Sequence, residues 1–331
     1  MKLTILTDIG LKLDMPEWQK MLSNFDVSAY HDTTPDLVVE RSRGSEILLT
    51  NKVVITPEHL AQLPEVKYII MASTGTNVVD LNYCHEHGIW CSNVPAYSTN
   101  SVAQLVFSHL LNIYTHADHY ARKNRVGAWS ETTDFCYTDS PLYELAGKTL
   151  GIVGLGAIGL RVAKIALAFG MNVVALSSKT SVPGALTTIA DAEEAEGMSS
   201  IRVTDSEDEF YASCDVISLH CPLAATNAGM INAGSIAKMK DGVIIINTAR
   251  GGLINEADLR VALDSGKVAA FAADVLSVEP APKENVLLPH PNVYVTPHVA
   301  WMTEEALVRL NKTIIRNVNN YINEGKPIDI V

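Results

Sequence analysis

The sequence predicts an α/β fold built around two parallel sheets. Its 331 residues correspond to about two domains of ordinary size. Short β-rich runs alternate with helical patterns almost throughout the chain, and this alternation is typical of βαβ units. The series of predicted strands starts again near residue 148, which indicates a second sheet in the second half of the chain.

The first predicted sheet occupies the N-terminal third of the chain. Its buried strands are expected at residues 2–7, 46–54, 66–72 and 90–94. Helical segments such as 56–63 and 80–87 lie between them. Because strands that alternate with helices pair in parallel, we expect these segments to form one α/β unit.

The second predicted sheet has six strands in order along the chain. They are expected at residues 149–154, 172–177, 215–221, 242–248, 269–275 and 292–296. Six such strands match a complete dinucleotide-binding sheet. The stretch 180–208 is rich in Ser, Thr, Ala and acidic residues, so it is predicted to be an exposed excursion from this sheet.

Two long helices are predicted beside these strands, at residues 99–123 and from about 302 to 324. The last helix follows the second sheet, and we expect no further domain after it. This helix is therefore expected to return to the first domain and pack there. The predicted domains are residues 1–98 with 300–331, and residues 99–299.

The composition argues against some classes of partner and indicates the cellular compartment. The chain is 47% apolar and 19% charged, as in ordinary globular proteins, and its net charge of −12 argues against a nucleic-acid-binding surface. Five cysteines without a Cys-x-x-Cys pair suit reduced thiols in the cytoplasm and no structural metal site. The first apolar run is interrupted at Asp8, which argues against a signal peptide, and no apolar stretch is long enough to span a membrane.

A glycine-rich loop follows the first strand of the second series and opens a helix. The segment 154–159 reads GLGAIG. Gly154 allows a tight turn, Gly156 lets the backbone approach a pyrophosphate, and Gly159 allows close packing of helix and strand. Ala157 and Ile158 begin the helix, whose N-terminal N–H groups attract phosphate. The loop predicts a dinucleotide cofactor, the alternative being a structural turn in an unrelated α/β fold.

The end of the next strand bears on which dinucleotide binds. An acidic residue is expected there to hold the ribose hydroxyls of NAD, but this sequence has Ser177, Ser178 and Lys179. Serine hydroxyls and a lysine charge can bind the 2′-phosphate of NADP. We therefore favour NADP over NAD. The alternative is that Lys179 is a solvated loop residue and either cofactor fits.

Three further segments each follow a predicted strand of the second sheet, at residues 247–252, 274–280 and 296–301. Ligands of open α/β sheets bind at the carboxyl ends of the strands. Reduction of a keto acid needs a cation for the carboxylate and carbonyl, which Arg250 supplies. It also needs a proton donor near neutral pH, which His298 supplies, with Glu279 as its carboxylate partner. Taken singly, the three residues could instead be a loop cap, a core histidine and a solvated charge.

The chain resembles the D-isomer-specific 2-hydroxyacid dehydrogenases over nearly its whole length. The matching segments are 93–104 (NVPAYSTNSVAQ), 154–159, 221–223 (CPL), 247–259 (NTARGGLINEADL), 272–280 (AADVLSVEP) and 292–303 (NVYVTPHVAWMT). The resemblance implies two Rossmann-like or flavodoxin-like domains with an active-site cleft between them. It also implies that Arg250, Glu279 and His298 are the catalytic residues, with His298 the general acid and base.

The same resemblance implies the binding residues. The expected substrate contacts are Arg250, His298 and the loop residues Ser73, Thr74 and Gly75, whose N–H groups would hold the substrate carboxylate. A simple strand-to-helix turn is the alternative for that loop. Asp274 is expected beside the nicotinamide. Further expected cofactor contacts are Thr74, Cys221, Pro222, Thr226, Thr248, Ala249, His298 and Ala300.

Within the family, the segments 129–154 and 298–303 look most like glycerate dehydrogenases, also called hydroxypyruvate reductases. Glu279 argues against a formate dehydrogenase, and the short C-terminus leaves no room for a regulatory domain. The expected substrates are hydroxypyruvate or glyoxylate, and the expected assembly is a homodimer. Two alternatives stay open: an enzyme for D-lactate or a bulkier D-2-hydroxy acid, and a dinucleotide-sensing module that resembles a corepressor.

Overall fold

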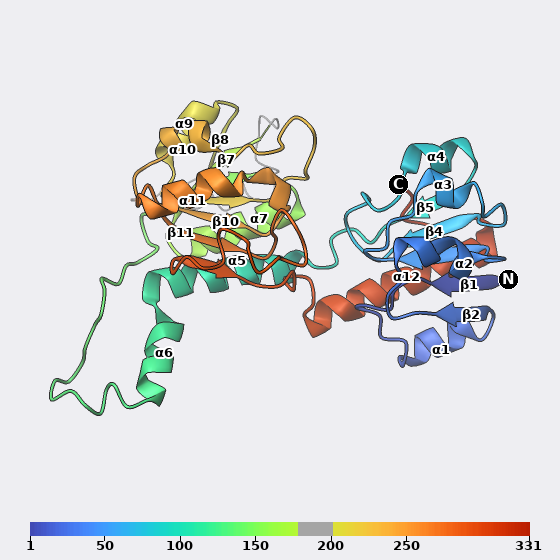
Figure 1. Ribbon diagram of the computed structural model, residues 1–331, viewed down its shortest axis with the longest axis horizontal. Coiled ribbons are helices and arrows are strands. Elements are labelled where there is room, and N and C mark those ends of the chain that lie inside the picture. Colours follow the sequence, from blue (N-terminus) through green and yellow to red (C-terminus); the bar gives the residue numbers. More distant parts are fainter. Residues whose placement is uncertain (178–200) are drawn as a thin grey trace. The chain divides into compact units, whose positions relative to one another are not determined.

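The computed structural model describes residues 1–177 and 201–331. The chain divides into two compact units, residues 1–98 with 301–331 and residues 99–300 (Figure 1). The second boundary lies between residues 300 and 301, one residue later than the expected boundary between 299 and 300. The assignment of the first unit to the substrate stays a prediction. No described helix is long and apolar enough to cross a membrane.

The first unit contains a five-stranded parallel sheet. Its strands are β1 (Lys2–Ile5), β2 (Asp26–Ala29), β3 (Ile47–Thr50), β4 (Tyr68–Met71) and β5 (Trp90–Ser92), in the order β2-β1-β3-β4-β5. This is the flavodoxin-like order. The four predicted strands are confirmed, but β2 was missed. Its side chains are only half-buried or exposed, so its sequence lacks the apolar run of a buried strand.

Helices cover both faces of this first sheet. They are α1 (Pro16–Leu22), α2 (Val38–Ser42), α3 (Pro57–Leu60), α4 (Leu81–Glu86) and the C-terminal α12 (Glu304–Glu324). Alternate strand residues face opposite cores: Ile47 packs in the cluster that includes α1 and α12, while Leu48 packs in the cluster that includes α3 and α4. Because both faces are buried, the strands other than β2 read as mainly apolar runs.

The second unit contains a seven-stranded parallel sheet. Its strands are β6 (Thr149–Val153), β7 (Asn172–Leu176), β8 (Ile201–Thr204), β9 (Val216–Leu219), β10 (Val243–Asn247), β11 (Val268–Ala273) and β12 (Val293–Val295). Their order is β12-β11-β10-β9-β6-β7-β8, the dinucleotide-binding order with one extra strand. The six predicted strands are confirmed. The expected excursion at 180–208 is wrong in part, because residues 201–204 form β8 and pair with β7; residues 178–200 lie outside the described part.

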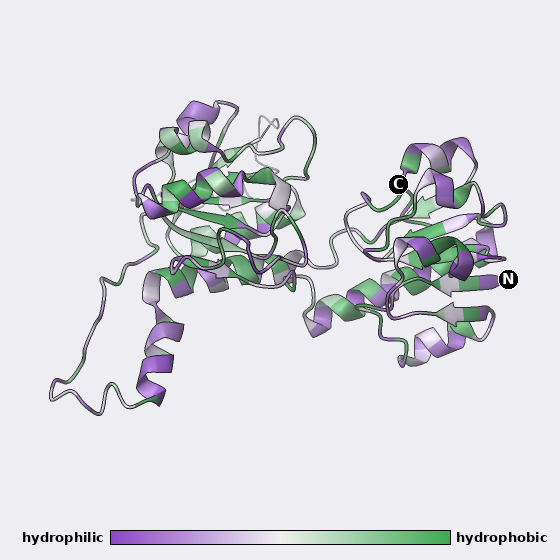
Figure 2. Cartoon of the chain, in the orientation of Figure 1, coloured by the Kyte–Doolittle hydropathy of each residue, from purple (hydrophilic) through white to green (hydrophobic). Residues whose placement is uncertain are grey.

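The predicted single helix at 99–123 is two helices, α5 (Thr99–Thr115) and α6 (Ala117–Arg125). The break is at His116, whose φ of 50° is left-handed and cannot continue a helix. The side chain of Asn112 accepts the N–H of Asp118 at 3.1 Å and so caps the new helix. α5 buries one face against the sheet, whereas α6 has no buried residue and projects from the unit as a hydrophilic helix (Figures 1 and 2).

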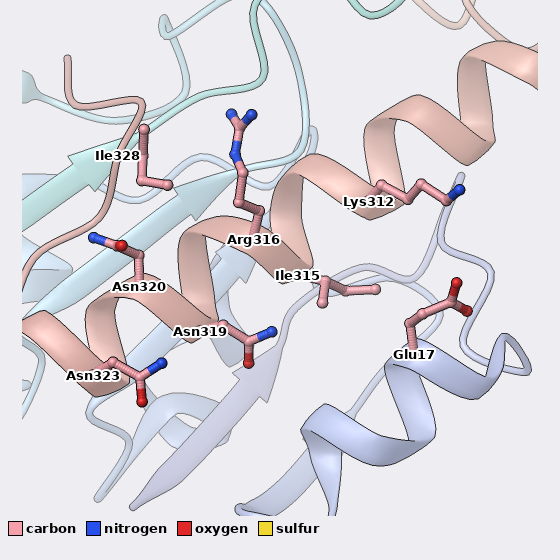
Figure 3. Close-up of a pocket in the computed structure, with 8 residues that line it drawn as sticks. All are labelled: Glu17, Lys312, Ile315, Arg316, Asn319, Asn320, Asn323 and Ile328. Atoms are coloured by element: carbon pink, nitrogen blue, oxygen red, sulfur yellow. The ribbon is translucent and has the colours of Figure 1, made fainter.

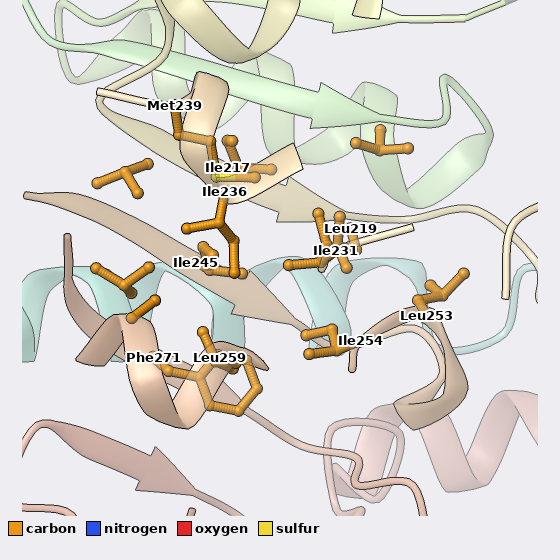
Figure 4. Packing of buried hydrophobic residues seen from close by; sticks show 14 of the residues in the cluster. Ile217, Leu219, Ile231, Ile236, Met239, Ile245, Leu253, Ile254, Leu259 and Phe271 are labelled. Atoms are coloured by element: carbon orange, nitrogen blue, oxygen red, sulfur yellow. The ribbon is translucent and has the colours of Figure 1, made fainter. Parts of the chain in front are cut away.

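Two apolar cores hold the second sheet rigid. α5 and α7 (Ala157–Ala168) cover one face. The other face is covered by α9 (Glu207–Ser213), α10 (Ala233–Lys238) and α11 (Glu256–Asp264). Figure 4 shows this second core, where Ile217, Ile245 and Phe271 from neighbouring strands pack against Leu259 of α11. The polar residues that follow these strands are therefore attached to a fixed base.

Candidate active site

The strand register of the second sheet brings four polar residues into one row. Asn247 of β10 pairs with Leu219 of β9 and with Ala273 of β11, and Ala273 pairs with Val295 of β12. The residues that follow these four are His220, Thr248, Asp274 and Thr296. They lie along the carboxyl edge of the sheet, where ligands of this architecture bind.

The glycine-rich loop lies at the same edge, between β6 and α7. Gly154 has a φ of 98°, and a Cβ there would come within 2.9 Å of the His220 carbonyl oxygen. A Cβ at Gly159 would collide with the carbonyl of Gly154. At Gly156, the N-cap of α7, a Cβ would meet no heavy atom within 4 Å. The protein itself thus needs two of the three glycines, and the space at Gly156 fits a phosphate at the helix N-terminus.

Two buried polar atoms at this edge have no hydrogen-bond partner among the described residues: Nδ1 of His220 and Oγ1 of Thr248. Burial lowers the pKa of the His220 imidazole to about 4, so the ring is neutral at pH 7. Its other nitrogen, Nε2, lies 2.8 Å from Oγ of Ser218. Buried polar groups without partners are rare in native proteins. These two atoms fit an edge over which a polar dinucleotide lies.

The predicted catalytic histidine and glutamate are in direct contact. Nδ1 of His298 lies 2.6 Å from Oε2 of Glu279, and both side chains are partly exposed. Oε1 of Glu279 accepts the backbone N–H of Leu276 at 3.0 Å, which fixes the carboxylate. Because an ionised carboxylate only accepts, Nδ1 of His298 carries the shared proton and Nε2 is left for a substrate.

Arg250 stands on a tightly held turn after β10. The fully buried side chain of Asn247 accepts the N–H of Ala249 at 3.0 Å and donates to the carbonyl of Arg250 at 2.8 Å. A Cβ at Gly251 would collide with the carbonyl of Leu276, so the turn packs against the segment that leads to Glu279. The guanidinium donates to the Ala249 carbonyl at 2.7 Å, a bond that uses one of its five N–H groups.

Asp274 holds the turn that carries His298. Its carboxylate is 2% exposed and accepts the hydroxyl of Thr296 at 2.6 Å. It also accepts the backbone N–H groups of Val299 at 2.9 Å and Ala300 at 2.8 Å. His298 lies inside this turn with a left-handed φ of 55°. The fixed turn therefore sets the direction of the imidazole.

In the first unit, the predicted substrate loop follows β4. Its carbonyl groups all bond to the protein: Val94 N–H donates to Ser73 at 2.9 Å, Asn93 Nδ2 to Thr74 at 2.8 Å, and Ser73 Oγ to Gly75 at 2.6 Å. In the described chain, the N–H groups of residues 73–76 donate to no protein acceptor. A loop with its carbonyls turned to the protein and its N–H groups available can bind a carboxylate.

Comparison with known proteins identifies the family. The family model for the D-isomer specific 2-hydroxyacid dehydrogenase, NAD binding domain, matches residues 107–300. The chain belongs to this family. Membership confirms the predicted class: the protein is a nicotinamide-dependent oxidoreductase that interconverts 2-hydroxy acids and 2-keto acids.

Individual relatives align with most or all of the chain. A hydroxypyruvate reductase of Blautia hydrogenotrophica is 37% identical over 100% of this chain and 99% of its own. A glycerate dehydrogenase of Methylorubrum extorquens is 38% identical over 90% of this chain and 89% of its own. The crystal structure of a glyoxylate reductase from Paecilomyes thermophila matches with a TM-score of 0.84 and 28% identity, covering 100% of this chain and 98% of the other.

The remaining cofactor residues predicted for this dehydrogenase lie on loops at the same edge of its second sheet. Cys221, Pro222 and Thr226 follow β9, and Asn227 braces their loop by donating to the Pro222 carbonyl at 2.8 Å. Ala249 follows β10. Their contacts with the dinucleotide stay predictions.

The residues predicted to select the cofactor of the dehydrogenase follow β7. The N–H of Ser177 donates to the carbonyl of Thr204 at 3.3 Å, so Ser177 is tied to the end of β8. Ser178 and Lys179 lie outside the described residues. Only Ser177 can therefore be located relative to the sheet.

Sequence reasoning missed three residues that support the site of this dehydrogenase: Asn93, Asn247 and Thr296. Asn93 and Asn247 lie in segments that carried the resemblance, so a signal was present at both positions. Thr296 likewise lies in a matching segment, 292–303. The pairing of Thr296 with Asp274, 22 residues away, depends on the strand register, which the sequence does not display.

A separate groove of about 500 Å³ runs beside α12 in the first unit of the dehydrogenase (Figure 3). Six of its eight lining residues are polar or charged, among them Glu17, Lys312 and Arg316. Arg316 already pairs with Asp329. No predicted site residue within the described ranges 1–177 and 201–331 lines this groove.

Proposed function

We propose that this dehydrogenase reduces a small 2-keto acid to the D-2-hydroxy acid, with hydroxypyruvate or glyoxylate as the substrate. The contact between His298 and Glu279 carries the proposal, because it supplies an oriented proton donor on the unit that binds the dinucleotide. The printed names of the relatives, hydroxypyruvate reductase, glycerate dehydrogenase and glyoxylate reductase, support the substrate class.

Each step of the reduction is assigned to a named group. Arg250 binds the substrate carboxylate and polarises the keto group through paired N–H donors. The N–H groups of residues 73–76 are proposed to bind the same carboxylate. The nicotinamide, when bound, supplies the hydride that reduces the carbonyl carbon. Nε2 of His298 donates the proton to the resulting oxygen, while Glu279 stabilises the charged imidazole before that transfer.

Initial rates with hydroxypyruvate, glyoxylate and pyruvate, each with NADPH and NADH, test the proposal. We expect the highest kcat/KM with hydroxypyruvate or glyoxylate. A higher kcat/KM with pyruvate or a branched keto acid would replace the proposal with the D-lactate or bulkier-substrate alternative. Turnover near background with every keto acid would favour the corepressor-like alternative.

NADPH is the proposed cofactor, because the described end of β7 carries Ser177 where an acid would repel the 2′-phosphate. The variant Ser177→Asp should lower the ratio of NADPH to NADH kcat/KM by about tenfold, the effect of one unfavourable charge contact. Ser177→Ala is the matched control, since it removes the hydroxyl without adding charge. An unchanged ratio in Ser177→Asp would show that this strand end does not contact the ribose.

We also propose a cytoplasmic homodimer that associates through the cofactor-binding unit. The segment after α6 exposes large apolar side chains, with Phe135 at 93% and Val126 at 81%. Trp129, Leu142 and Tyr143 in the same segment are more than half exposed. Such a set of exposed apolar residues is typical of a protein interface. Light scattering of wild type and Phe135→Asp tests this, and a monomeric wild type at micromolar concentration would exclude the dimer.

A further inference from the structure

α5 carries a buried histidine that the proposed mechanism does not use. His109 is 9% exposed and lies on the helix face that also buries Val106, Leu110 and Ile113. Burial lowers the pKa of its imidazole, and the nearby carboxylate of Asp274 opposes this only in part. A neutral imidazole in an apolar core still needs a polar partner. That partner is Thr296, whose Oγ1 lies 3.5 Å from Nε2 of His109.

The contacts of Thr296 determine which atom donates. Its hydroxyl lies 2.6 Å from Oδ1 of Asp274 and 3.3 Å from the carbonyl oxygen of Ala273. Both neighbours are acceptors, so the single hydroxyl proton points toward one of them. The hydroxyl oxygen can then only accept from His109. This assigns the proton of the neutral His109 ring to Nε2, with the direction His109 to Thr296 to Asp274.

Asp274, the last residue in this series of hydrogen bonds, holds the turn that carries His298. Asp274 accepts the N–H groups of Val299 and Ala300, which directly follow His298 in the chain. If the Thr296 hydroxyl turned toward the Ala273 carbonyl, Asp274 would lose its shortest hydrogen bond. A buried carboxylate that loses a donor is left partly unsatisfied, which destabilises its arrangement with the remaining donors. The turn at 298–300 would then shift, and His298 would lose its fixed direction toward Glu279.

We propose that His109 is a positioning residue for His298, acting through Thr296 and Asp274. The inference rests on the proposed catalytic role of His298, but the geometry that carries it involves no substrate. Donation from Nε2 polarises the Thr296 hydroxyl and so strengthens the 2.6 Å hydrogen bond that it donates to Asp274. Asp274 in turn keeps His298 in its left-handed conformation, 2.6 Å from Glu279.

A matched pair of variants separates this role from simple core packing. His109→Leu fills the site without a donor, whereas His109→Gln places an amide N–H at a similar distance from the backbone. We expect His109→Leu to lower kcat for hydroxypyruvate with saturating NADPH by about tenfold, the equivalent of one hydrogen bond, with a smaller change in KM. His109→Gln should stay within about threefold of wild type, since its amide N–H can restore that bond.

A second measurement needs no turnover. In full-length protein labelled with ¹⁵N-histidine, the Nδ1–H proton of His298 should give a downfield resonance because it is bonded to Glu279. His298→Ala assigns the signal. We expect His109→Leu to broaden or remove it and His109→Gln to keep it. If His109→Leu does not fold, Thr296→Val replaces it, because valine lacks the hydroxyl. Thr296→Ser then replaces His109→Gln, because serine keeps the hydroxyl.

The two readouts decide separate questions. Wild-type kcat together with a wild-type His298 resonance in His109→Leu would overturn the positioning role, whatever the melting temperature of the variant. A wild-type protein that reduces no keto acid would overturn the proposed function instead. In that case the His298 resonance still tests whether His109 controls the turn.

Discussion

The two units of this dehydrogenase share a fold class but present different chemistry at the carboxyl ends of their strands. The second sheet presents ionisable side chains there, among them Arg250, Asp274 and His298. The first sheet presents the backbone of residues 73–76, whose carbonyls bond to the protein. Both sheets are parallel and covered by helices on both faces, so the difference arises in the loops. A parallel α/β fold provides the edge, and the residues after each strand decide what the edge can do.

The side chains that hold the turns at each edge also differ between the two units. In the second unit, buried polar side chains such as Asn247 and Asp274 hold the turns that carry charged groups. In the first unit, the side chain of Asn93 holds the carbonyl of Thr74. We therefore expect substitutions in the second unit to affect the chemical step, and those in the first to affect substrate binding.

The largest expected effect is in the second unit. His298→Ala should reduce kcat by about 100-fold or more, because it removes the proton donor. Steady-state rates with hydroxypyruvate and NADPH measure the change. His31→Ala in the first unit is the control, since His31 is an exposed histidine. Turnover of His298→Ala close to wild type would remove His298 from the proposed role.

The second expected effect concerns acid stability. His220 in the second unit has a folded pKa of about 4, against about 6.5 in an unfolded chain. Between these values the unfolded state binds more protons, so the stability that the neutral ring contributes is present above pH 6.5 and lost as the pH falls toward 4. The expected loss between pH 7 and pH 5 is about 2 kcal/mol. Urea denaturation at both pH values measures it.

A matched variant shows whether His220 causes that loss. His220→Asn removes the titrating group, so its stability should fall less than that of wild type over the same pH interval. Equal losses in wild type and His220→Asn would place the acid sensitivity elsewhere.

The smallest expected effect is in the first unit. Asn93→Ala removes the hydrogen bond to the Thr74 carbonyl, and one such bond is worth about 1 kcal/mol. We expect KM for the keto acid to rise about fivefold, with kcat and KM for NADPH nearly unchanged. Asn323→Ala on α12 is a control at an exposed asparagine of the same unit. A loss of kcat without a change in KM would contradict the division of labour between the two edges.

The sequence predicted the elements whose signals are strong along the chain. Buried parallel strands read as continuous apolar runs, so the six strands of the second series were found. β2 and β8 are short and half-exposed, and neither displays such a run. The break at His116 was missed because the helical pattern continues across it, and the capping contact from Asn112 is local geometry.

The site was predicted to a similar depth. Arg250, Glu279 and His298 could be found because they follow predicted strands, and the structure brings His298 and Glu279 together. The support beneath them could not be found in that way. Thr296 meets Asp274 only through the pairing of β11 with β12, and His109 on a helix looks like any core residue until its partner is located.

Among the three loop glycines, Gly156 is the one that the fold itself does not require. The backbone there has a φ of −79°, which any residue adopts, and a Cβ would point into open space. A library of variants selected only for folding would therefore accept alanine at position 156 while rejecting it at 154 and 159. Since Gly156 is predicted to lie against the pyrophosphate, we expect the same library selected for nucleotide binding to reject alanine at all three positions. Gly156→Ala is then expected to be a well-folded dehydrogenase that holds its cofactor poorly, a reagent for separating the effects of the protein's presence from those of its catalysis.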